Sequence, residues 1–228
     1  MPDSEPPPDH IGHRDRLRQR LLDGTDGLQD YELIEYLLML AIPRRDTKPL
    51  AKALLREFGG LPALLAAGND AIRRVPGAGD STIAALRVAH ATALRLLQGE
   101  VAAKPMLGNW QALIDYLRAD MAAAPVERVR VLHLNTRNML IRDEVMGEGS
   151  IDQAPVYVRE VIRRAMDLGS AALILVHNHP SGDPAPSRAD IEVTRLIADA
   201  GKRLGITLHD HIIMGATEHA SMKSLGLM

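Results

Sequence analysis

Cysteine is absent from the 228 residues of this sequence. A disulfide scaffold, a thiolate zinc site, an iron–sulfur cluster and a cysteine nucleophile are therefore all excluded. Any bound metal must be held by nitrogen and oxygen atoms. Aromatic residues are also few, with one Trp, one Phe and four Tyr, which leaves little surface on which single-stranded nucleic-acid bases could stack.

An excess of either charge is missing as well. The sequence has 27 Lys and Arg against 29 Asp and Glu, for a formal net charge of −2. This balance disfavours a chain that wraps nucleic acid by bulk positive charge alone. Hydrophobic residues make up 46% and charged residues 25% of the chain, as is usual for globular proteins in water.

Long apolar runs and a signal peptide are not found. The longest apolar run near the amino terminus covers residues 37–42, far short of the ~20 residues that span a bilayer. Residues 1–12 are acidic and rich in proline, which predicts a disordered tail and not a targeting segment. We therefore expect a cytoplasmic protein with no membrane partner.

The spacing of apolar residues divides the chain into two parts. From 13 to 99, apolar residues recur every three or four positions, and proline or glycine ends successive segments. This pattern predicts a small all-α domain. A linker follows at about 99–108, and residues 105–228 then mix helical and strand patterns. We expect an α/β domain there.

The expected α/β domain contains a run, 171–176, of the kind found in strands that are covered on both faces. Segments 128–134 and 139–146 alternate around a turn, as the strands of a β-hairpin do. The other expected elements are helices over 109–121, 158–168 and 187–204 and a last strand over 206–214.

Two histidines follow the expected buried strand, in the segment HNHPSGDPAPSRAD. Residues two apart in an extended chain point the same way, so His177 and His179 can approach one ion together. Ser187 stands where it would cap the next helix, and Asp190, in the first turn of that helix, can direct a carboxylate at the pair. Two imidazoles and one carboxylate leave a fourth tetrahedral position for water, as in catalytic zinc sites, where the ion makes water acidic enough to give hydroxide near neutral pH.

Each of these residues also has a purely structural interpretation. A lone His-x-His at a strand end is usually structural, Ser187 could be only an N-cap, and Asp190 could be only an acid favoured by the helix dipole. The proline and glycine of the loop could be simple turn residues. Because all of these explanations would have to hold at once, the spacing favours a metal site.

The spacing of His177, His179, Ser187 and Asp190 is that of the JAMM motif of MPN/JAB metalloproteases. The string VHNHPSGDPAPSRADIEVTRLI, with LHDHIIMG after it and GHRDRLRQRLL near the amino terminus, resembles the RadC family of JAB-domain proteins. The resemblance implies a cytidine deaminase-like mixed sheet with helices. It also implies a Zn²⁺ ion held by the two histidines and the aspartate, and hydrolysis of a peptide or isopeptide bond in a peptide or protein substrate.

The resemblance further implies a glutamate that acts as general acid and base, on a strand upstream of the histidines. Glu127 stands at the start of the first of two expected strands and is our prediction for this role. Glu144 in the second strand and Glu160 at the start of the next helix are the alternatives; their structural interpretations are a solvated strand face and a first-turn acid favoured by the dipole. In the implied mechanism Ser187 helps to stabilise the oxyanion by hydrogen bonding.

The remaining histidines of the α/β region carry no such motif. His209-Asp210-His211 forms a second His-x-His group, for which a structural role is favoured. Asp210 or His211 could instead support the metal ligands from behind. For His133 and His219 we expect core or surface roles.

The helical part contains one candidate nucleic-acid contact. Val75-Pro76-Gly77-Ala78-Gly79 before a helix is similar to a helix-hairpin-helix turn, in which backbone N–H groups face a phosphate. Gly77 and Gly79 are the candidate residues, and a plain packing turn is the alternative. The resemblance to a family named for DNA repair adds DNA as a candidate partner.

Three hypotheses follow from these patterns. The leading one is a zinc-dependent JAMM-type hydrolase whose helical domain directs it. The second is a DNA-associated binding or repair factor in which the metal domain is structural or regulatory. The third is a metal-dependent phosphodiesterase, since zinc hydroxide can attack phosphorus as well as carbon.

Overall fold

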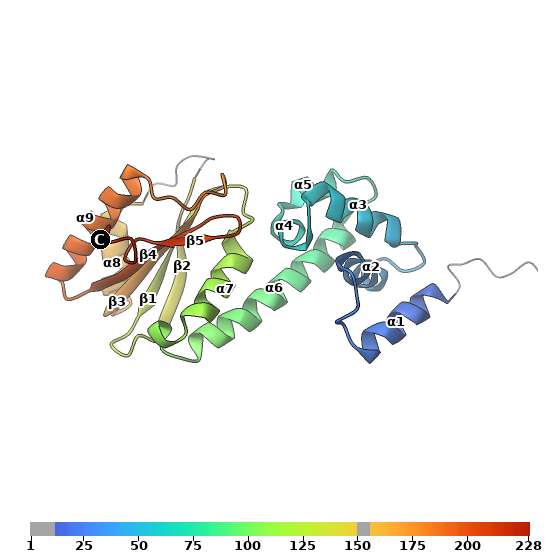
Figure 1. Cartoon of the computed structure of the whole chain (residues 1–228), viewed down its shortest axis with the longest axis horizontal. Coiled ribbons are helices and arrows are strands. Elements are labelled where there is room, and N and C mark those ends of the chain that lie inside the picture. Colours follow the sequence, from blue (N-terminus) through green and yellow to red (C-terminus); the bar gives the residue numbers. More distant parts are fainter. Residues whose placement is uncertain (1–11, 150–155) are drawn as a thin grey trace, which may run out of the picture. The chain divides into compact units, whose positions relative to one another are not determined.

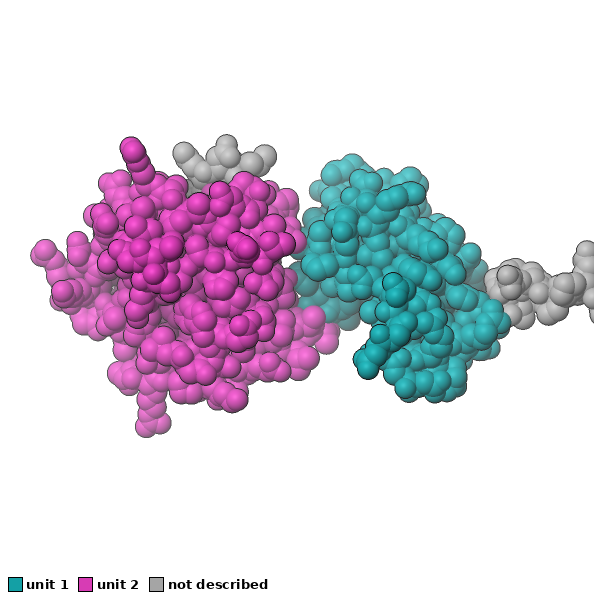
Figure 2. Space-filling model, in the orientation of Figure 1, with its two compact units in different colours: residues 1–91 teal, residues 92–228 magenta. Residues whose placement is uncertain are grey.

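The computed structural model describes residues 12–149 and 156–228, which form two compact units (Figures 1 and 2). One unit ends at Ala91 and the other begins at Thr92. The division falls inside helix α6 (Asp80–Ala102), which continues beyond residue 99, where the linker was expected to begin. The domain limits 13–99 and 105–228 therefore stay predictions. The tail predicted for residues 1–12 lies, except for its last residue, outside the described residues.

The amino-terminal unit is all-helical in its described part, as predicted. Its core is an apolar cluster whose most buried members include Leu38, Leu54, Leu64 and Leu86, each fully inaccessible to solvent. A chain reversal after α3 uses Gly59, whose φ of 77° is costly for other residues. The helices are α1 (His13–Asp23), α2 (Asp30–Ala41), α3 (Lys48–Phe58), α4 (Leu61–Ala66), α5 (Asn69–Arg73) and the first part of α6.

The second unit is built around a mixed five-stranded sheet in the order β2-β1-β3-β4-β5 (Figure 1). β3 and β4 run parallel, and the other neighbouring strands are antiparallel. This confirms the predicted α/β architecture. The strands are β1 (Arg128–Leu134), β2 (Leu140–Glu148), β3 (Ala172–Asn178), β4 (Thr207–Met214) and β5 (His219–Ser221). The helices are the end of α6, α7 (Trp110–Met121), α8 (Val158–Asp167) and α9 (Arg188–Arg203), with the 3-10 turn η1 (Met106–Gly108).

Both faces of the sheet are covered by helices. The side chains of α7 and the end of α6 form one core with Leu132, Ile174 and Ile212. α8 and α9 form the other core with Val131 and Leu175. Every residue of β3 is buried, as its continuous apolar run predicts.

The sheet ends where the candidate site begins. The carboxyl end of β3 lies between the start of β1 and the end of β4, because β1 pairs with it antiparallel and β4 parallel. β5 was not predicted, since its three residues are too few to show a periodic pattern. Among the described helices, none is long and apolar enough to cross a bilayer.

Candidate metal centre

The three predicted ligands converge at the carboxyl end of β3. His177 Nε2 lies 2.9 Å from His179 Nε2 and 3.3 Å from Asp190 Oδ1. His179 Nε2 lies 3.8 Å from Asp190 Oδ2. β3 and its extension supply the histidines, and the first turn of α9 supplies the carboxylate. The geometry therefore brings together the three side chains that the spacing singled out.

These distances fit one tetrahedral ion. Zinc bonds of roughly 2.0–2.2 Å at tetrahedral angles separate two ligand atoms by roughly 3.3 Å. The two histidine nitrogens lie 2.9 Å apart, and each has one oxygen of Asp190 near it, Oδ1 at 3.3 Å from His177 and Oδ2 at 3.8 Å from His179. Two imidazole nitrogens in such close contact repel one another unless a proton or a cation lies between their lone pairs. The nitrogen and oxygen donors thus suit a divalent metal.

The two histidines lie in different environments. His177 is almost completely buried, and burial lowers its pKa to about 4, so its ring is neutral at pH 7. Its Nδ1 lies 2.8 Å from Nε2 of His211. His179 is half-buried, and its Nδ1–H donates to the carbonyl of Asp183 at 2.7 Å. The nearby carboxylate of Asp190 raises the pKa of His179.

Asp190 is held in place by the start of its own helix. Its Oδ2 accepts hydrogen bonds from the Ser187 backbone N–H at 2.8 Å and from the Ser187 hydroxyl at 2.6 Å, and the Asp190 N–H donates back to Ser187 Oγ. This is a capping box, in which helix formation itself orients the carboxylate. Burial by itself would raise the pKa of Asp190, but His179, His177 and Ser187 together hold that pKa well below its usual range.

Ser187 therefore acts first on Asp190. Its one hydroxyl proton is engaged with the carboxylate, so donation to an oxyanion requires rotation of the hydroxyl. Ser187 is thus both the N-cap of α9 and a hydrogen-bond partner of the candidate ligand Asp190. The oxyanion role stays a prediction.

Glu127 precedes β1 and is half-buried. In the β1–β3 register the last pair is Val129 with His177; the same register two residues further on would set Glu127 opposite His179. Directly opposed residues of an antiparallel pair share one face. The charge of Glu127 also contributes to the raised pKa of His179. The structure thus brings Glu127 to the candidate site.

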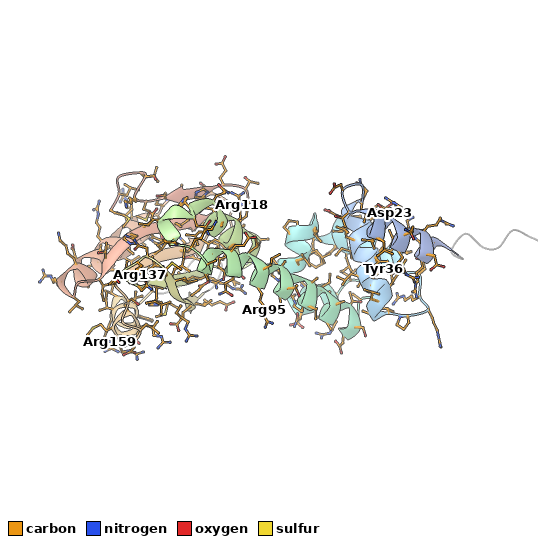
Figure 3. The ribbon with its side chains drawn as sticks, turned by 90° about the horizontal axis from the view of Figure 1, so that it is seen from below. Asp23, Tyr36, Arg95, Arg118, Arg137 and Arg159 are labelled. Carbon is orange, nitrogen blue, oxygen red and sulfur yellow. The ribbon has the colours of Figure 1, made fainter. Side chains whose placement is uncertain are left out.

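The two alternative glutamates make ion pairs elsewhere. Glu144 forms a two-pronged contact with Arg164 on α8, at 2.7 and 2.5 Å. Glu160 pairs with Arg163 at 2.6 Å and with its exposed neighbour Arg159, labelled in Figure 3. These ion pairs give both glutamates a structural role, and Glu127 stays our prediction for the general base.

Asn178, between the two histidines, was not singled out by sequence reasoning. Its side chain is fully buried and accepts a hydrogen bond from the Arg128 N–H at 2.9 Å. Its amide donates to the carbonyls of Val126 at 3.1 Å and Ala124 at 3.5 Å. The side chain thus holds the backbone on both sides of Glu127, and only its place inside the motif hinted at this role.

The three residues of the second His-x-His group have different partners. His211 contacts His177, as described above. Asp210, on the opposite side of the strand, accepts hydrogen bonds from the Ser221 hydroxyl at 2.5 Å and the Lys223 N–H at 3.0 Å, and so anchors the chain after β5. His209 bonds to Asn138 Oδ1 at 2.6 Å.

The contacts given for His133 and His219, the other two histidines of the α/β region, lie outside the candidate site. His133 is buried, with its Nδ1 at 3.0 Å from Ser170 Oγ. His219 begins β5 and is half-buried. Both positions agree with the core or surface roles expected from the sequence.

The turn before α6 has the backbone shape that its glycines allow. Gly77 has a φ of 87°, and its carbonyl accepts a hydrogen bond from Arg45 at 3.0 Å. The first residue of α6, Asp80, is acidic and pairs with Arg73 at 2.9 Å. A carboxylate at this helix end competes with a phosphate for the helix dipole. DNA contact through Gly77 and Gly79 stays a prediction.

The second unit is thus an α/β domain with a mixed sheet and a candidate mononuclear metal centre. Two histidines at a strand end and a carboxylate from the next helix form this centre, which is of the type that hydrolases use. The family model described as RadC-like JAB domain matches residues 107–227. This match covers more than half of the chain, so the protein belongs to the RadC-like JAB domain family.

Proposed function

We propose that this protein is a zinc-dependent hydrolase that cleaves a peptide or isopeptide bond with metal-activated water. The observation that carries the proposal is the convergence of His177 Nε2, His179 Nε2 and Asp190 Oδ1 at the end of β3. A donor set of two imidazoles and one carboxylate leaves a fourth position open, as in catalytic and not structural zinc sites. The family membership supports the same chemistry.

The protein's own residues divide the work. A zinc ion held by His177, His179 and Asp190 would supply Lewis acidity and would lower the pKa of water toward ~7. The carboxylate of Glu127 accepts the proton of the attacking water and passes it to the leaving nitrogen. Ser187 keeps Asp190 oriented through two hydrogen bonds, and after rotation its hydroxyl can donate to the developing oxyanion.

Metal content tests the first half of the proposal. Protein purified without chelators should contain one zinc ion per chain, measured by plasma mass spectrometry. His177→Ala should remove it, whereas His209→Ala, a change on the neighbouring strand outside the ligand set, should retain it. Wild-type protein without stoichiometric metal, or His177→Ala with unchanged metal, contradicts the proposal.

Hydrolysis tests the second half. The zinc-loaded protein is incubated with a peptide library, with isopeptide-linked peptides and with DNA, and products are read by mass spectrometry. Glu127→Gln should keep its zinc and lose at least 10²-fold in rate, the usual contribution of a general base. A Glu127→Gln enzyme as fast as wild type refutes the role of Glu127. Cleavage of DNA alone would instead establish the phosphodiesterase hypothesis.

A further inference from the structure

A buried chain of hydrogen bonds leads from the candidate ligand His177 to helix α9. His177 Nδ1 lies 2.8 Å from His211 Nε2, and His211 Nδ1 lies 2.6 Å from Thr194 Oγ1. The Thr194 hydroxyl lies 2.5 Å from the backbone carbonyl of Asp190. His177, His211 and Thr194 are at most 2% exposed. The chain thus links β3, β4 and α9 behind the site.

The proton in each of these hydrogen bonds can be assigned, because some of the atoms can only accept. The Asp190 carbonyl oxygen can only accept, and two oxygens 2.5 Å apart repel unless a proton lies between them, so Thr194 gives its single hydroxyl proton to Asp190. The other neighbour of that hydroxyl, Met222 Sδ at 3.5 Å, is also only an acceptor. In either case Thr194 Oγ1 must accept from His211, and the proton of the His211 ring therefore sits on Nδ1.

The proton of the candidate ligand His177 can be assigned in the same way. His211 is almost completely buried, which disfavours a second, charging proton on its ring. Its single proton lies on Nδ1, so Nε2 accepts from His177 Nδ1–H. His177, also neutral, keeps its lone pair on Nε2, the atom that faces His179 and Asp190. His179 reaches the same state through one hydrogen bond to a backbone carbonyl.

We propose that Thr194 and His211 are positioning residues that fix His177 in the tautomer whose Nε2 lone pair faces the metal. This inference rests on the proposed function, since the tautomer matters only if His177 binds an ion. Partners of this kind behind metal-bound histidines typically change metal affinity by 10–100-fold. In this protein the partner is a second histidine, itself fixed by a threonine.

Substitution of Thr194 tests the proposal. Thr194→Val keeps the shape of the side chain but removes the acceptor for His211 Nδ1–H. The His211 proton then moves to Nε2, where it would face the proton on His177 Nδ1. His177 must therefore move its own proton to Nε2, the atom that would bind the metal. Zinc affinity, measured by competition with a chromogenic chelator, should fall about 10–100-fold. Thr194→Ser, which keeps the hydroxyl, should bind zinc within about threefold of wild type.

Nitrogen-15 NMR of the metal-free protein reports which ring nitrogen of each histidine carries the proton, a property that a change in packing alone does not alter. In the wild type, His177 and His211 should both show the proton on Nδ1; in Thr194→Val, both should shift toward Nε2. Wild-type zinc affinity and unchanged ring tautomers in Thr194→Val would overturn the proposal, as would equal losses of affinity in the Ser and Val variants. A protein that binds no zinc refutes the proposed function, and the ring tautomers then decide this inference by themselves.

Discussion

The side chain of Asn178 offers a sharp test of how the site is held together, through the change Asn178→Ala. Its two well-formed hydrogen bonds, at 2.9 and 3.1 Å, contribute about 1 kcal/mol each, and leaving partly buried backbone groups without a partner adds about 1 kcal/mol or more. We expect Asn178→Ala to lower the free energy of unfolding by about 3 kcal/mol.

Urea unfolding can be followed through Trp110, the single tryptophan of the chain, because it packs against the core of the same unit. Asn178→Asp serves as the matched variant: it keeps the acceptor for the Arg128 N–H but opposes carbonyl oxygens with a carboxylate, so it should be at least as destabilised at pH 7. Both variants should keep their zinc and lose at least tenfold in hydrolysis, since Glu127 loses its fixed backbone. A free energy of unfolding within 0.5 kcal/mol of wild type for Asn178→Ala would refute this reasoning.

Three further predictions concern pH, the helix cap and the loop. In the folded protein the pKa values of His177 and His211 are about 4 and about 3, below the ordinary value of about 6.5. As the pH falls, the unfolded metal-free chain therefore takes up protons at these two rings before the folded protein does. Stability is therefore full above pH 6.5 and is lost as the pH falls toward 4, by about 2 kcal/mol per ring at pH 5, partly offset by the raised pKa of His179; urea melts that show no loss between pH 7 and 5 contradict this. Ser187→Ala should cost about 1 kcal/mol of stability and weaken zinc binding about tenfold in chelator competition, and unchanged affinity would show that the cap does not orient the ligand. Gly215→Ala would place a methyl group against a carbonyl of the loop that follows the histidines, and should lower both the melting temperature and zinc affinity; a variant equal to wild type in both would show that this close approach is not required.

Much of the fold was predictable because its signals are local. The apolar run of β3 indicates a strand buried on both faces, and the structure confirms it. Proline and glycine mark the two ends of α3, since Pro49 lies in its first turn and Gly59 follows its last residue. The continuation of α6 to Ala102 was missed, because its last turns are fixed by packing of Val101 into the second unit's core and not by a local pattern.

The candidate site was predictable to the extent that its ligands share one stretch of chain. His177, His179 and Asp190 are fixed by a strand end and a helix cap thirteen residues apart or less. Thr194 and His211 are different, because their pairing depends on how α9 packs over β4. No spacing rule within one segment reports such a contact between elements.

X-ray absorption at the zinc edge tests the central claim most directly, because it reports the atoms that bind the ion. For the zinc-loaded protein we predict two imidazole nitrogens, from His177 and His179, and oxygen donors that include Asp190, all at roughly 2.0–2.2 Å. His177→Ala should remove the bound zinc altogether. A third imidazole would show that His211 binds the ion directly, and a spectrum without imidazole would contradict the assigned site.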